Sequence, residues 1–131
     1  MTKFAVQVAY HLNQYRQGNR DDAFFGLIEM NHDVVPELIN SFQKESEPQT
    51  RAFLVEVIWE HRQQSSISFL AEVLQESDVW KEALNGLVTL ASPVALEGLR
   101  SARNRQFSKK KETDEFREWL EEAITQVEAQ L

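Results

Sequence analysis

Apolar residues recur along this chain at spacings of three and four, which is typical of amphipathic helices. The pattern predicts an all-α protein, since no segment alternates apolar and polar residues as a strand would. The expected helices are residues 3–17, 21–31, 33–45, 48–63, 66–76, 78–91, 93–105 and 113–130. Side chains that suit helix N-caps stand at or just before the start of several of them: Asp33, Ser66, Ser77 or Asp78, Ser92 and Thr113. Pro36, Pro48 and Pro93 fall in first turns, where a missing N–H costs nothing.

The helical pattern also repeats. Residues 35–58 align with residues 67–90, so that Leu38 corresponds to Leu70, and a third start follows at "VALEGL". Each repeat of about 30 residues is a helix, a short acidic turn and a second helix. One such pair cannot cover its own apolar faces, so the repeats are expected to stack on one another and bury them.

These segments resemble HEAT repeats in three respects: a Leu-rich first helix, an Ala near the start of the second, and Leu or Val at helical spacing. The resemblance covers about residues 33–105, with residues 21–32 and 113–130 as degenerate caps. It implies an all-α superhelix of HEAT-like repeats, with about eight helices in a single domain over residues 1–131. In such a stack the second helices line the concave face.

Composition narrows the function classes. The chain of 131 residues is 42% hydrophobic and has no cysteine, which excludes disulfide scaffolds, thiol nucleophiles and thiolate zinc sites. No apolar stretch reaches the ~18 residues of a membrane span. Gln7, His11 and Asn13 interrupt the apolar character of the N-terminal segment, so it does not look like a signal peptide. We therefore expect a cytoplasmic protein.

The net charge of −7 is unevenly distributed along the chain. Residues 1–20 hold three basic side chains and no acid, and residues 100–111 hold six basic side chains and no acid. The remaining 99 residues carry a net charge of −16. An acidic body repels nucleic acid and attracts basic partners. The run 100–111 could contact phosphates, but it is confined to one helix end, where cations also suit the helix dipole.

Candidate catalytic chemistry is sparse. Glu29, His32 and Asp33 could lie near a metal ion, but a turn capped by Asn31 and Asp33 explains the same residues. The chain has no G-x-S-x-G motif and no Gly-rich phosphate loop. We expect neither an enzyme nor a bound metal or cofactor.

The three tryptophans differ in their expected surroundings. Trp119 shares an apolar stripe with Phe116, and Trp80 stands beside Ala83, so both are expected in the core. Trp59 lies on a second apolar stripe of its helix. It either packs against the preceding repeat or is an exposed interface anchor.

The polar stripes of the second helices are the expected partner-binding surface, unless they are ordinary solvated faces. The candidate residues are Glu56, Trp59, Glu60, Gln63, Asp78, Glu82, Asn85 and Thr89. A short, acidic HEAT protein without cysteine also resembles the immunity proteins of polymorphic and contact-dependent toxin systems, whose partners are often basic nucleases. The resemblance implies that the chain binds and neutralises a toxin domain, with no small-molecule substrate and no membrane contact. The alternatives are a generic HEAT adaptor or regulatory scaffold, a nucleic-acid binder, and a lyase-type or chaperone-type HEAT protein.

Overall fold

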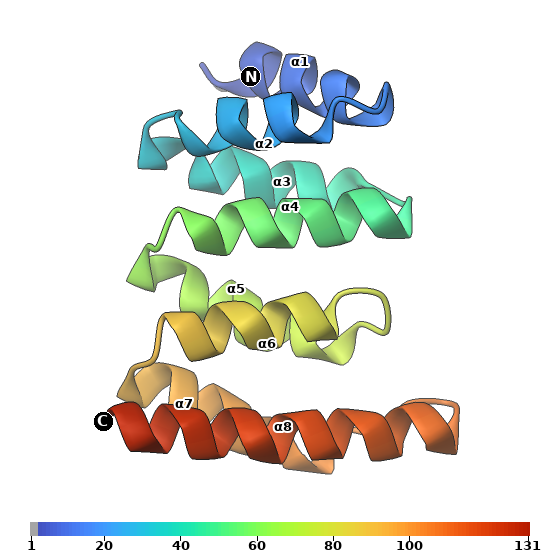
Figure 1. The fold of residues 1–131 in the computed structure, drawn as a ribbon, viewed down its shortest axis with the longest axis vertical. Helices are drawn as coiled ribbons and strands as arrows, with labels where there is room; N and C mark the ends of the chain where they lie inside the picture. Colours follow the sequence, from blue (N-terminus) through green and yellow to red (C-terminus); the bar gives the residue numbers. More distant parts are fainter. Residues whose placement is uncertain (1–2) are drawn as a thin grey trace. The chain divides into compact units, whose positions relative to one another are not determined.

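The computed structural model describes residues 3–131, which are all-α (Figure 1). These residues form eight α-helices and four short 3₁₀ helices, with no strand among them, so the predicted fold class is confirmed. The α-helices are α1 (Ala5–Arg16), α2 (Arg20–Ile28), α3 (Val35–Lys44), α4 (Pro48–Glu60), α5 (Ile67–Glu72), α6 (Trp80–Thr89), α7 (Pro93–Ser101) and α8 (Lys110–Gln130). The 3₁₀ helices are His32–Val34, Gln64–Ser66, Val73–Gln75 and Ala102–Asn104.

Two candidate residues fall outside the α-helices in which they were expected. α4 ends at Glu60, so Gln63 lies in the connection that precedes the 3₁₀ helix Gln64–Ser66. α6 begins at Trp80, so Asp78 stands in the turn before that helix. The boundary predictions for these two residues are wrong.

Some of the N-cap residues predicted from the sequence are confirmed and others are wrong. Ser92 caps α7, since its Oγ accepts a hydrogen bond from the amide of Ala95 at 3.1 Å. Asn31, rather than Asp33, caps the 3₁₀ helix His32–Val34 that leads into α3, and its Oδ1 accepts from the amide of Asp33 at 2.8 Å. The prediction that Thr113 caps the last helix is wrong, because α8 begins three residues earlier and Thr113 is buried in its first turn.

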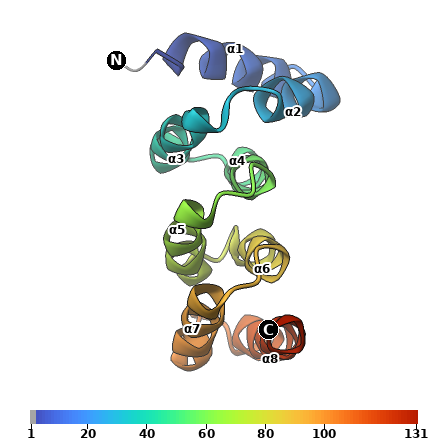
Figure 2. The ribbon, with the colours of Figure 1, turned by 90° about the vertical axis from the view of Figure 1, so that its left-hand side faces the viewer.

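The chain divides into two compact units, Met1–Arg62 and Gln63–Leu131. In the first unit α1 packs on α2 and α3 packs on α4. These two hairpins meet through α1 against α3 and α2 against α4. Figure 2 views α3 and α4 nearly along their axes but α1 from the side, so α1 lies across α3.

The second unit is more regular. α5 packs on α6 and α7 on α8 as hairpins, while α5 also packs on α7 and α6 on α8. The odd and even helices therefore form two layers within this unit, as Figure 2 shows. First helices stack on first helices and second on second, as expected for helical repeats. The superhelix and the single domain stay predictions.

Each unit has its own buried core. Fully buried side chains of the first unit include Leu27, Leu38, Leu54 and Ile58. Those of the second include Leu70, Leu74, Leu87, Leu99, Leu120, Trp80 and Phe116. In the second unit α5 and α7 approach closely at Gly98, where an added Cβ would lie only 2.9 Å from the Cβ of Ala71.

Candidate protein-binding surfaces

Three of the predicted partner-binding residues share one face of α4 in the first unit. Trp59 and Glu60 follow Glu56 by three and four residues, so both lie next to Glu56 on the following turn. All three side chains are partly buried rather than fully exposed. Trp59 is therefore neither a fully buried core residue nor a freely projecting anchor, and the two interpretations of it both stay predictions.

Arginines of the same unit pair with the two carboxylates of this face. Arg20 Nη2 lies 2.6 Å from Glu56 Oε1, and Arg62 Nη2 lies 3.6 Å from Glu60 Oε1. The Arg20 guanidinium also lies 5.4 Å from the centroid of the Phe24 ring. The acidic character expected of α4 is thus locally balanced by cations, which weakens any long-range attraction that this face exerts.

Three other predicted residues lie on α6 in the second unit. Asn85 and Thr89 are exposed one turn apart, and Glu82 is partly buried. The Thr89 hydroxyl donates to the Asn85 carbonyl oxygen at 2.8 Å, within the helix. Asn85 and Thr89 therefore form an exposed strip along α6.

Trp80 lies in the core, as predicted, with 1% of its surface exposed. Its indole Nε1–H donates to Glu112 Oε2 at 3.1 Å, and the Ser77 hydroxyl donates to the same oxygen at 2.6 Å. These donors stabilise the carboxylate, and the Ser77 bond is the first cause of a Glu112 pKa below its ordinary value. Through these hydrogen bonds Glu112 connects the first turn of α8 to the start of α6.

The prediction that Trp119 belongs to the core is wrong, because 41% of this side chain is exposed. Its ring meets Trp80 edge-on, with centroids 5.7 Å apart and planes at 88°. Lys81 Nζ lies 5.1 Å from the Trp119 ring centroid and 3.2 Å from Glu115 Oε1. The indole of Trp119 is thus packed in part, against Trp80 and Lys81, and in part exposed.

The exposed indole lies beside α6, because Lys81 of that helix contacts both Trp119 and Glu115 of α8. Trp80 bonds to Glu112 near the start of α6, and Gln130 Nε2 lies 3.5 Å from the Val88 carbonyl oxygen near its end. α6 and α8 therefore run side by side in the same direction, as Figure 1 shows. We define the α6–α8 face by its members on the two helices: Lys81, Asn85, Thr89, Glu115, Trp119 and Glu122. Sequence reasoning found Asn85 and Thr89 but missed the other four.

The basic run at residues 100–111 folds back on α8. Arg103 makes a two-pronged ion pair with Glu121, with both N–O distances 2.9 Å. Arg100 Nη2 lies 2.6 Å from Glu128 Oε2, and Lys110 Nζ lies 2.7 Å from Asp114 Oδ2. Hydrogen bonding to Arg103 lowers the Glu121 pKa, and the same contact raises the Arg103 pKa.

These ion pairs change the expected charge distribution. Arg16 and Arg20 of the N-terminal basic segment likewise pair with Glu45 and Glu56. Arginines of both basic segments therefore lie next to glutamates of the other 99 residues. Their charges offset part of the −16 that the sequence assigns to those residues, so the negative potential around them is weaker than the sequence suggested.

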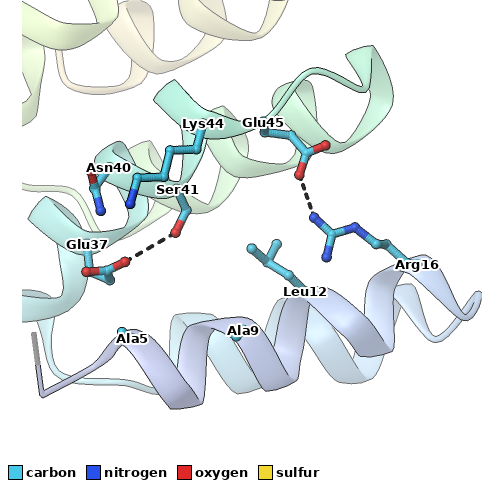
Figure 3. A pocket seen from close by; sticks show the side chains of 9 residues that line it. All are labelled: Ala5, Ala9, Leu12, Arg16, Glu37, Asn40, Ser41, Lys44 and Glu45. Carbon is cyan, nitrogen blue, oxygen red and sulfur yellow. Dashed lines mark hydrogen bonds and ion pairs between the residues drawn. The ribbon is translucent and has the colours of Figure 1, made fainter. Parts of the chain in front are cut away.

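A shallow groove of about 320 Å³ lies between α1 and α3 in the first unit (Figure 3). Ala5, Ala9 and Leu12 line it on the α1 side, while Arg16 reaches over to Glu45 with an N–O distance of 2.5 Å. The α3 side presents Glu37, Asn40, Ser41 and Lys44. The mixture of charges leaves no single sign to attract an ion, so we do not assign a ligand to this groove.

Other site classes have little support in the described residues. No three His, Asp or Glu side chains among residues 3–131 are close enough to hold a metal ion. His32 Nε2 lies 3.8 Å from Asp33 Oδ1, and both side chains are exposed. Within the same residues no helix combines the length and apolar composition that a bilayer span requires.

Comparisons with protein-family models, curated proteins and solved structures found no match to this chain.

Proposed function

We propose that this chain is a non-catalytic protein-binding module, and more specifically an immunity protein that neutralises a basic toxin domain. The observation that carries the binding proposal is Trp119, a tryptophan 41% exposed on a folded surface. Large aromatic side chains with exposed faces are enriched among residues that dominate protein interfaces. Glu115, Glu118 and Glu122 surround this one on α8, which favours a basic partner.

Charge reversal on α8 tests the chemistry of the partner. Glu118→Lys with Glu122→Lys should slow association and weaken its salt dependence, because carboxylates at an interface mainly steer encounter. The matched control is Glu72→Lys with Glu97→Lys, which makes the same charge change at exposed positions of α5 and α7. An equal effect of both pairs would show that net charge alone, and not the position of these carboxylates beside Trp119, governs association.

The immunity proposal is tested with the product of the gene immediately upstream in the source genome. If that gene encodes a toxin domain, co-expression of this chain should restore growth, and the two purified proteins should form a complex. Continued toxicity with the chain in excess would contradict the immunity proposal. Binding without any effect on growth would favour the alternative, a HEAT-like adaptor or regulatory scaffold.

A further inference from the structure

The surroundings of Lys81 resemble a recognition site for a cation. Its ammonium lies 5.1 Å from the Trp119 ring centroid, 5.4 Å from the Trp80 ring centroid and 3.2 Å from Glu115 Oε1. The two rings stand nearly perpendicular, at 88°. Two indoles and a carboxylate therefore face one ammonium group, which is the combination that attracts cations to aromatic surfaces.

The ammonium of Lys81 is at the surface, although one of its ring contacts is with the buried Trp80, and its contacts are weak enough to be exchanged. The Lys81 side chain is 51% exposed and that of Glu115 is 48% exposed. Ion pairs and cation–π contacts at exposed positions contribute little to stability. Lysine also moves easily, because its charge sits on a flexible stem of four carbons.

We propose that the α6–α8 face binds an arginine or lysine side chain of a protein partner, and that Lys81 occupies this position in the unbound chain. This inference rests on the proposed protein-binding function. The incoming cation lies on the exposed indole of Trp119 between Glu115 and Glu122, which stand one turn to either side of it. Lys81 moves into solvent at the same time, so the internal cation lowers affinity for the external one.

Charge favours this occupant over an apolar or acidic one. Glu115 and Glu122 give this part of α8 two carboxylates against the single charge of Lys81. Arginine is the better fit, because its planar guanidinium can stack on an indole and donate to a carboxylate at the same time. An acidic segment would meet repulsion from both glutamates.

The test uses the whole chain and a defined probe, an acetylated and amidated triarginine peptide, at low salt. The three indole N–H signals of Trp59, Trp80 and Trp119 are followed by NMR during titration. The signal of Trp119 should move most. Lys81→Ala should bind the peptide about two- to fivefold more tightly than the unmodified chain, since the competing cation is gone.

The matched control is Lys110→Ala. It removes an equal charge from another exposed ion pair, that of Lys110 with Asp114 on α8. It should strengthen peptide binding much less than Lys81→Ala. Equal gains in the two variants would overturn the proposal, because they would reflect net charge only.

A second variant separates the ring from its packing. Trp119→Leu keeps an apolar side chain against Trp80 but removes the indole face, so it should lose most peptide binding while circular dichroism stays unchanged. Retained binding in folded Trp119→Leu would also overturn the proposal. A natural partner that binds this variant normally would place its interface elsewhere, and the proposed protein-binding function would still stand.

Discussion

Replacement of Glu112 by glutamine tests how α8 is fastened to α6. The carboxylate oxygen accepts hydrogen bonds from Ser77 at 2.6 Å and Trp80 at 3.1 Å. Glu112→Gln keeps the size and one acceptor oxygen but removes the charge. Hydrogen bonds to charged groups contribute about 1.5–3 kcal/mol and neutral ones about 0.5–1.5 kcal/mol. Because the side chain is partly exposed, we expect a loss of about 1 kcal/mol in the free energy of unfolding.

The pH dependence of this loss identifies its cause. The pKa of Glu112 is lower in the folded chain than in the unfolded chain, so ionisation stabilises the fold above the unfolded pKa of about 4.3. That contribution disappears as the pH falls through the lower, folded pKa. The difference between the original chain and Glu112→Gln should therefore be full near neutral pH and shrink in strong acid.

Urea unfolding followed by tryptophan fluorescence measures the difference at several pH values. In a thermal unfolding experiment on the whole chain, a loss of about 1 kcal/mol should lower the melting temperature by roughly 2–8 °C. Glu118→Gln is the matched control, because Glu118 is an exposed glutamate of the same helix. A difference that stays constant into strong acid, or that Glu118→Gln reproduces, would refute the reasoning.

Three further predictions concern packing, the α4 face and nucleic acid. Gly98→Ala should destabilise the second unit by about 1–3 kcal/mol despite alanine's better helix propensity, because the new Cβ would lie 2.9 Å from that of Ala71; a raised melting temperature would contradict this. Trp59→Ala should lower the free energy of unfolding by about 2–4 kcal/mol, since the side chain is partly buried, and measuring partner affinity on the folded variant separates this loss from an interface role. Residues 100–111 should bind duplex and single-stranded DNA only weakly at about 150 mM salt, because Arg100 and Arg103 are already paired with carboxylates; sub-micromolar affinity in gel-shift titration would be the contrary result.

The helices could be predicted from the sequence because apolar residues at a helical spacing show which side of each helix faces the core. Their ends could not, because several depend on contacts made elsewhere in the fold. Thr113 looks like a cap in the sequence, yet its hydroxyl accepts from the amide of Phe107 at 2.8 Å. α8 begins at Lys110, three residues before the residue that the local pattern selects.

The candidate surface was predicted only in part, for two physical reasons. An apolar stripe gives the direction in which a side chain points but not what fraction of it is buried. Trp119, on the same stripe as the buried Phe116, was therefore expected to be equally buried. Charges were also counted along the chain rather than in space. Arg103 and Glu121 are 18 residues apart and form one ion pair, which no local window of sequence would join.

The arrangement of helices within each unit has a kinetic consequence. The principal packing partners of every α-helix are the next helix or the next but one in its own unit. The chain therefore has to close only short loops to form its contacts, and such low contact order is associated with folding in microseconds to milliseconds. Folding can begin at any hairpin and spread to its neighbour, so a substitution such as Gly98→Ala should act on the step in which α7 packs on α5.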